Sequence, residues 1–221
     1  MIGHLDGSRR LADHWRVKPP AAIVRRLAVA LLAVALLAGC SGNDAASGDP
    51  SNSNGLADFL PATPGYGFPT TVETQQVMDA TEASRALPSG AGATLQELQS
   101  LHYRSGFARI WGTSTDYVTM AVLALPAASA TDLVTFERQT LAGSQNTYVT
   151  SHADIPGSFV FVISSPTQAS GSQNAELCNG VWFAYRGYAF ESLACGSTPS
   201  WATQIEQAAK ALYNRARSRA G

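Results

Sequence analysis

The stretch CNGVWFAYRGYAFESLAC, residues 178–195, decides the fold of this chain. Apolar and aromatic residues run along both sides of Arg186-Gly187, which predicts two antiparallel strands joined by a two-residue turn. Counting outward from that turn, Cys178 faces Cys195 at a non-hydrogen-bonded pair, where Cα atoms lie about 4.5 Å apart and a disulfide fits. We therefore predict a disulfide here that stabilises the fold by about 3 kcal/mol. A bulge, or a turn at residues 179–180, would shift the register by one residue.

The two faces of this predicted hairpin differ in character, because successive side chains of a strand point to opposite sides. Five residues that we expect to be core share one face: Val181, Phe183, Tyr185, Tyr188 and Phe190. The other face carries Cys178, Gly180, Trp182, Ala184, Ala189, Glu191, Leu193 and Cys195. There Trp182 lies opposite Glu191, and we expect this pair to be partly exposed at the edge of a recognition surface.

Upstream of the hairpin, alternation and turn residues predict four more strands. Residues 107–112 and 116–125 read as two strands joined by the polar turn 113–115. Residues 148–152 and 158–164 read as two more, separated by a Pro-Gly turn, and residues 166–173 form a polar loop before the hairpin. Strands linked mainly by short turns make an antiparallel sheet.

Helices are predicted between and after these strands. One runs over residues 129–143, with Ser129 as its cap. The last begins at Pro199-Ser200, with Glu206 and Lys210 as a favourable i,i+4 pair. Its apolar stripe consists of Trp201, Ile205, Ala208, Ala209 and Leu212.

The segment before residue 93 is harder to assign. Thr94 and Glu97 match a capping box for a short helix, and a weaker helix pattern covers residues 73–87. Residues 56–69 contain three prolines among aromatic and apolar residues, which suggests an extended arm across the surface. We therefore expect a Pro-rich arm with a possible short helix at 56–92. A single α+β domain at 93–217 follows, with two layers and its helices packed on one face of a mainly antiparallel sheet.

Residues 25–40, RRLAVALLAVALLAGC, have the parts of an export signal. A pair of arginines precedes an uncharged apolar run of twelve residues, 27–38. That run is too short for the roughly 20 residues that span a bilayer, so an uncleaved membrane helix or a buried core helix is the less favoured interpretation. Export by the twin-arginine route through Arg25-Arg26, and translation starting at Val17, are minor alternatives.

The end of this run, Leu37-Ala38-Gly39-Cys40, resembles the lipobox of bacterial lipoproteins. Thirteen Arg against two Lys is typical of actinobacterial coding. The resemblance implies that residues 1–39 are a signal peptide and that Cys40 carries a diacylglycerol and palmitate-type anchor on the outer face of the cell membrane. Residues 40–55 contain no aliphatic side chain larger than Ala, which suits a flexible tether.

Charge and cysteine content agree with this location. The leader holds six of the fifteen basic residues and two of the sixteen acidic ones, so cleavage leaves nine basic and fourteen acidic residues. This negative net charge argues against nucleic acid as a partner. The cluster Arg215, Arg217 and Arg219 is interpreted as a solvated or dipole-complementing helix end rather than a contact to an anionic surface. With Cys40 acylated, the other two cysteines can pair in an oxidising compartment.

Catalytic chemistry has little support in the sequence. After residue 39 the histidines are His102 and His152, and no zinc, nucleotide or nucleophile-elbow motif occurs. His152, Asp154 and Ser158 could be arranged as a nucleophilic set, but such residues fall this close by chance. We expect no cofactor, no metal site and no enzyme activity, with a hydrolase as the remote alternative.

Two functions of different classes remain open. The first is a binding or sensor module for an envelope ligand, either a partner protein or a small lipophilic molecule, with Trp111, Tyr117, Trp182 and Glu191 as candidate contacts. The second is an interaction or scaffold subunit of an envelope complex, docked through residues 56–69. The element order loosely resembles the small α+β extracytoplasmic domains of actinobacterial lipoproteins and kinase sensor modules. A pocket of several hundred Å³ would favour binding, and a large exposed apolar patch would favour the scaffold.

Overall fold

The computed structural model describes residues 55–219, except 72, 114, 166–175 and 197–200. All described residues belong to the second of two compact units of the chain, Ser41–Gly221. The predicted signal peptide, nearly all of the tether, the loop at 166–173 and the helix start at Pro199-Ser200 lie outside the described residues. Within the described part, each helix is too short or too polar to cross a bilayer.

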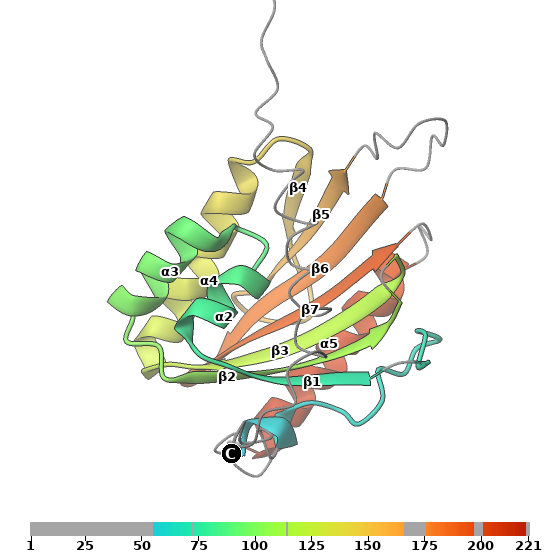
Figure 1. Ribbon diagram of the computed structural model, residues 1–221, viewed down its shortest axis with the longest axis horizontal. Helices are drawn as coiled ribbons and strands as arrows, with labels where there is room; N and C mark the ends of the chain where they lie inside the picture. Colours follow the sequence, from blue (N-terminus) through green and yellow to red (C-terminus); the bar gives the residue numbers. More distant parts are fainter. Residues whose placement is uncertain (1–54, 72, 114, 166–175, 197–200, 220–221) are drawn as a thin grey trace, which may run out of the picture. The chain divides into compact units, whose positions relative to one another are not determined.

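One antiparallel sheet of seven strands forms the centre of the domain (Figure 1). Its strand order is β1-β2-β3-β7-β6-β5-β4, so the three predicted hairpins are present and β1 and β4 form the edges. The α+β class and the antiparallel sheet are thereby confirmed. The strands are β1 (Glu73–Met78), β2 (Ser105–Gly112), β3 (Tyr117–Ala124), β4 (Thr147–Ser151), β5 (Phe159–Ser165), β6 (Glu176–Tyr185) and β7 (Tyr188–Gly196).

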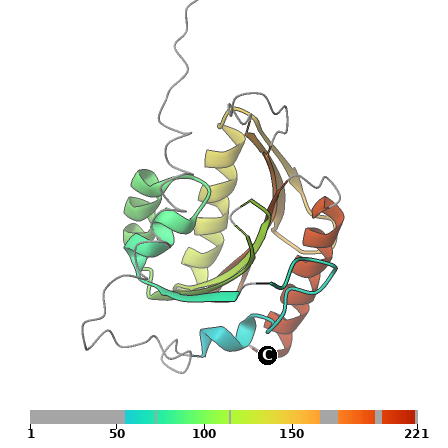
Figure 2. The same ribbon diagram turned by 45° about the vertical axis from the view of Figure 1, so that its right-hand side comes forward.

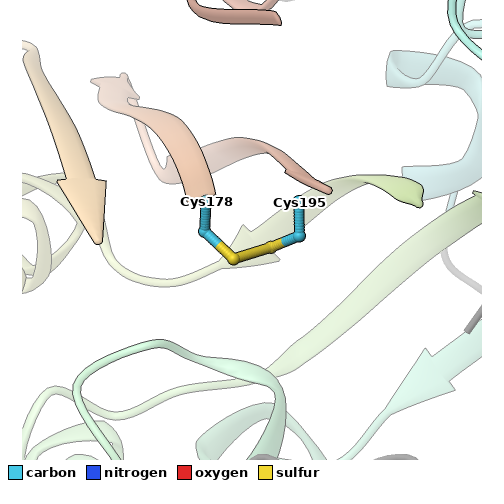
Figure 3. The surroundings of a disulfide bond; sticks show 2 residues. All are labelled: Cys178 and Cys195. Atoms are coloured by element: carbon cyan, nitrogen blue, oxygen red, sulfur yellow. A yellow bond between two sulfur atoms is a disulfide. The ribbon is translucent and has the colours of Figure 1, made fainter. Parts of the chain in front are cut away.

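The β6–β7 hairpin has the predicted register. Tyr185 pairs with Tyr188 across the turn, and Cys178 pairs with Cys195. These two cysteines form a disulfide, with their Cα atoms 4.0 Å apart (Figure 3). Because β6 and β7 are central strands, the disulfide cross-links two neighbouring strands in the middle of the sheet.

Two helices, α3 and α4, begin at other residues than the sequence suggested. α4 starts two residues before Ser129, directly after Pro126, which presets a helical φ. Thr94 lies inside α3 and its hydroxyl donates to the Gly90 carbonyl, so Gly90 is the N-cap and the predicted capping box is wrong. The helices are η3 (Leu56–Phe59), α2 (Ala80–Ala86), α3 (Ala91–Ser100), α4 (Ala127–Ala142) and α5 (Trp201–Arg219).

The weak helix expected at 73–87 is a strand followed by a helix. Residues 73–78 pair with β2 as the edge strand β1. The chain turns helical only at Asp79, whose side chain accepts from the Glu82 N–H while Glu82 caps the Asp79 N–H in return. This capping box, Asp79 to Glu82, fixes the start of α2 and leaves the preceding residues free to pair.

Helices cover both faces of the sheet, so the prediction of two layers with helices on one face is wrong (Figure 2). Phe183 and Phe190 pack in a cluster with α5 and η3, whereas Trp182 and Ala189 pack in a second cluster with α2, α3 and α4. The central strands are apolar on both sides, and each side needs a helical cover to exclude water.

The domain also starts well before residue 93. Leu56, Phe59, Leu60 and Phe68 are buried in the same cluster as α5, and β1 completes the sheet. These residues precede the predicted boundary but belong to the core, because their aromatic and aliphatic side chains cover apolar sheet surface.

Candidate functional site

A cleft of about 570 Å³ is lined by residues of α5 and of the segment 60–69, which we call the arm. Figure 2 shows this segment running beside α5. The arm follows η3 and leads into β1, and the cleft is named the α5–arm cleft below. Its floor reaches Met120 of β3. The described residues that line it are Pro61, Thr63, Pro64, Gly65, Tyr66, Met120, Ala208, Ala211, Leu212, Asn214, Arg215 and Ser218.

Helical spacing places the α5 residues of the cleft along one side. Ala208, Ala211, Arg215 and Ser218 recur every three or four residues, as one strip of a helix surface does. Leu212 and Met120 are almost fully buried at the floor, while Ala211 is exposed. The floor is therefore apolar and preformed, because its residues are held by the core beneath.

Contacts from the sheet and α5 hold the arm in place. Arg109 of β2 donates from one guanidinium nitrogen to the carbonyls of Leu60 and Pro61, at 3.1 and 2.6 Å. At the far end of the arm, Phe68 packs edge-on against Trp201 with ring centroids 5.8 Å apart. The wall of the cleft opposite α5 is therefore fixed at both ends.

Arg215 gives the cleft its charge. It is the one charged side chain among the described residues that line the cleft. Its Nε donates to the Asp58 carbonyl at 2.9 Å, and the Asp58 carboxylate pairs with Arg219 at 3.4 Å. Arg217 instead lies over the Tyr213 ring. The basic cluster, interpreted from sequence as a solvated helix end, thus contacts η3 and places one cation at the cleft.

The candidate contacts named from sequence do not meet in one site. Trp111 and Trp182 are buried on opposite faces of the sheet. Glu191 is 1 % exposed, so the expectation of a partly exposed Trp182–Glu191 pair is wrong. Tyr117 is half-buried opposite Cys195, four residues along β7 from Glu191 and hence about 14 Å away. Large residues on this sheet are enclosed because helices cover both sides of it.

Two buried carboxyl groups, Glu191 of β7 and Glu137 of α4, lie between α4 and the sheet. We call them the buried carboxyl pair. Burial, together with a smaller contribution from the charge of Glu137, raises the pKa of Glu191 to about 8. The indole N–H of Trp182 opposes this shift, although Nε1 lies outside hydrogen-bonding geometry. Glu191 is therefore mostly protonated at neutral pH.

One of the two carboxylate oxygens of Glu137 accepts a hydrogen bond from a hydroxyl group. Ser89 donates to its Oε1 at 2.6 Å and also contacts the hydroxyl of Thr94. The pKa of Glu137 is raised to about 7, because burial raises it by more than the hydrogen bonds from Ser89 lower it. This network ties α4 to the start of α3, which is where a capping box was expected.

The residues considered for catalysis do not form a nucleophile–base pair, because the Ser158 hydroxyl donates to a backbone carbonyl and not to His152. His152 Nδ1 accepts from the backbone N–H of Asp154, and Ser158 donates its hydroxyl proton to the Ile155 carbonyl at 2.6 Å. The Asp154 carboxylate is paired with Lys210 at 2.6 Å, which lowers its pKa. Lys210 therefore joins α5 to the β4–β5 connection instead of pairing with Glu206. In the described part of the chain, no cluster of three or more His, Cys, Asp or Glu residues could hold a metal ion.

The residues of the α5–arm cleft were missed from the sequence. Residues 56–69 were predicted to cross the domain surface, but nothing in the chain's pattern showed that they face α5. Ala208 and Leu212 were predicted to be core residues of the last helix, and their pattern does not indicate that they also line a cleft. The signal that could have found the site is the set of prolines in residues 61–69, since it keeps the arm extended beside a helix.

No protein-family model matches the chain, and no curated protein matches its sequence. Its fold is similar to that in the crystal structure of the extracellular domain of PknH from Mycobacterium tuberculosis. The TM-score is 0.50 at 12 % sequence identity, with 76 % of this chain and 97 % of that chain covered. At this identity the similarity establishes a shared fold: the chain folds like an actinobacterial extracellular domain.

Proposed function

We propose that this chain is a lipid-anchored extracytoplasmic binding module that holds an envelope ligand in the α5–arm cleft. The observation that carries the proposal is the cleft itself. Its volume of about 570 Å³ lies within the range of roughly 300–1,000 Å³ that small-molecule sites occupy. An apolar floor with a few polar groups is the usual composition of such sites.

The proposed location rests on three independent features. The lipobox at residues 37–40 supplies the anchor. The Cys178–Cys195 disulfide suits an oxidising compartment. The fold is shared with a domain that is described as extracellular. Fifteen residues separate Cys40 from Leu56, which allows the domain to reach up to about 50 Å from the bilayer.

Binding is proposed rather than catalysis because of the side chains that line the cleft. Among the described residues there, none is His, Asp, Glu or Cys, the groups that most often serve as bases, acids and nucleophiles. Arg215 can attract and orient a ligand, but it does not exchange a proton at ordinary pH.

A scaffold function has weaker support. The large apolar side chains exposed in the described part are Tyr66 and Tyr148. Tyr66 lines the cleft, and Tyr148 lies on the edge strand β4, so the two do not make a continuous patch. Stable docking surfaces usually present a larger apolar area.

Ligand capture can be tested on the full chain purified from its own membranes. We expect mass spectrometry of the extracted sample to find a small molecule bound to the wild-type chain. The substitution Ala211→Trp fills the cleft from an exposed position and should remove that molecule. Thr203→Trp, exposed on the same helix but outside the cleft, serves as the matched control and should retain it. Equal recovery from both variants, or no bound molecule in the wild type, would disprove the proposal.

A further inference from the structure

The volume of the α5–arm cleft matches a ligand with one alkyl chain. A water molecule takes up about 30 Å³, so a space of about 570 Å³ has room for roughly 20 non-hydrogen atoms or somewhat more. A fatty acid of about 16 carbons is of this size, and a two-chain phospholipid is much larger. The cleft therefore suits a single-chain molecule.

The cleft is lined by both apolar and polar side chains. Pro61, Pro64, Met120 and Leu212 provide apolar surface. Polar groups come from both walls: Asn214, Arg215 and Ser218 lie within about one turn of α5, and Thr63 and Tyr66 of the arm carry hydroxyl groups. A ligand that fills the cleft would bury an apolar body against the first set and place a polar group beside the second.

Charge decides what that polar group is. Arg215 carries a permanent positive charge, and its lining partners include no acidic residue in the described part of the chain. The nearby Asp58 carboxylate is paired with Arg219, and Arg215 uses its Nε on the Asp58 backbone carbonyl. A guanidinium binds carboxylate or phosphate oxygens with strong, charge-assisted hydrogen bonds.

We propose that the α5–arm cleft binds a single-chain anionic amphiphile, with its carboxylate or phosphate head at Arg215 and its alkyl chain along Met120 and Leu212. This inference rests on the proposed function and names the ligand class for the same site. The backbone of η3 holds the guanidinium at the cleft, because Arg215 Nε donates to the Asp58 carbonyl at 2.9 Å.

The test measures equilibrium binding of three probes to the full processed chain in lipid nanodiscs, with binding to empty nanodiscs subtracted. The probes are dodecanoate, dodecyl phosphate and dodecyl alcohol, which share a chain and differ in head group. We expect both anions to bind about tenfold more tightly than the alcohol, because charged hydrogen bonds contribute more than neutral ones. Acetate and inorganic phosphate, which have the heads alone, should bind far more weakly.

Arg215→Ala separates head recognition from a structural role. It should weaken binding of both anions about tenfold and leave the alcohol unchanged. Arg217→Ala, on the same helix but stacked on Tyr213, should change none of the three. Ala211→Trp should weaken all three probes.

Three results would overturn the inference. The anions and the alcohol could bind the wild type equally, Arg215→Ala could weaken the alcohol as much as the anions, or the head groups alone could bind as well as the full probes. The proposed function would survive each of these if the molecule recovered from membranes is neutral or a peptide and is still lost in Ala211→Trp. Loss of the proposed function would instead show as equal recovery from Ala211→Trp and Thr203→Trp.

Discussion

At the scale of single residues, the buried carboxyl pair couples the interior to pH. Glu137 and Glu191 have pKa values of about 7 and about 8, against 4.5 for an ordinary Glu. Burial is the main cause for both, because a low-dielectric interior disfavours the charged form. Each group therefore keeps its proton in the folded domain over a pH range in which the unfolded chain has lost it.

Stability should consequently fall as the pH rises. In this range the folded state binds more protons than the unfolded state. The stability that the two protonated carboxyl groups contribute is therefore complete below pH 4.5, the pKa of an ordinary Glu. It is lost as the pH rises through their folded-state pKa values of about 7 and about 8. The rise of its pKa from 4.5 to about 7 means that titration of Glu137 alone lowers the free energy of unfolding by about 3 kcal/mol. Urea unfolding of the wild type and of the double variant E137Q/E191Q measures the effect. Between about pH 5 and pH 9 the wild type should lose stability relative to the variant, and parallel pH curves would contradict this.

Gly180 shows how tightly the α4 face of the sheet is packed. A Cβ atom at this position would lie 2.2 Å from the Phe161 ring on the neighbouring strand. Gly180→Ala should therefore lower the free energy of unfolding by about 1–3 kcal/mol, in a thermal or urea melt. Gly92→Ala is the control, because its Cβ meets nothing within 4 Å and Ala favours the helix by about 1 kcal/mol. If the two variants shifted stability in the same direction, the packing argument would be wrong.

At the scale of elements, the β6–β7 hairpin is stabilised both by its neighbours and by its disulfide. β3 and β5 pair with its outer edges, so the hairpin should form without the covalent bond. The double variant C178A/C195A removes a cross-link between residues 17 positions apart and should lose about 3 kcal/mol in urea unfolding. Reducing agent should lower the stability of the wild type toward that of the variant and leave the variant unchanged. A wild type that reducing agent does not affect would contradict the prediction.

The arm depends on Arg109 for its position beside α5. Arg109→Ala removes two hydrogen bonds to the carbonyls of Leu60 and Pro61. We expect amide hydrogen exchange in residues 60–69 to become about tenfold faster, while exchange in the central strands stays slow. Arg138→Ala is a suitable control, because Arg138 is on α4 and contacts Ser151. Unchanged exchange of the arm in Arg109→Ala would show that other contacts hold it.

The sequence predicted elements well where a pattern is local. The register of residues 178–195 follows from one turn and from alternation, and the structure has it residue for residue. The edge strand β1 was missed because its residues, ETQQVM, carry little apolar alternation and gain their structure from pairing with β2. The packing of helices on both faces of the sheet was also not predicted. The near-continuous apolar run VWFAY, residues 181–185, is typical of a strand buried on both sides, whereas the pairing of Trp182 with Glu191 suggested partial exposure.

At the scale of the whole molecule, the α5–arm cleft and the buried carboxyl pair lie on opposite faces of the sheet. The helices that border them, α5 and α4, cover opposite faces (Figure 2). The cleft combines residues from the start, middle and end of the domain, so its existence depends on tertiary packing rather than on any local pattern. Sequence could therefore predict the α+β class, but the binding residues predicted from it are aromatic residues that belong to the core.

The anchor itself is a prediction about the whole chain. Cys40→Ala removes the thiol that the lipobox resemblance assigns to acylation. We expect the wild type to fractionate with membranes and to begin at a diacylglyceryl-modified Cys40, and the variant to be unprocessed or released. Mass spectrometry of the N-terminal peptide reads out both. A wild-type chain that keeps residues 1–39, or that carries an unmodified Cys40, would contradict the anchor.

The most direct test of ligand binding is a crystal structure of the chain purified from its native membranes, with no ligand added. The expected result is elongated electron density in the α5–arm cleft, in contact with Met120 and Arg215, that fits the molecule identified from the same sample by mass spectrometry. The Ala211→Trp variant should show no such density. A cleft filled with water in the wild type, or density for that molecule elsewhere on the domain, would contradict the proposed function.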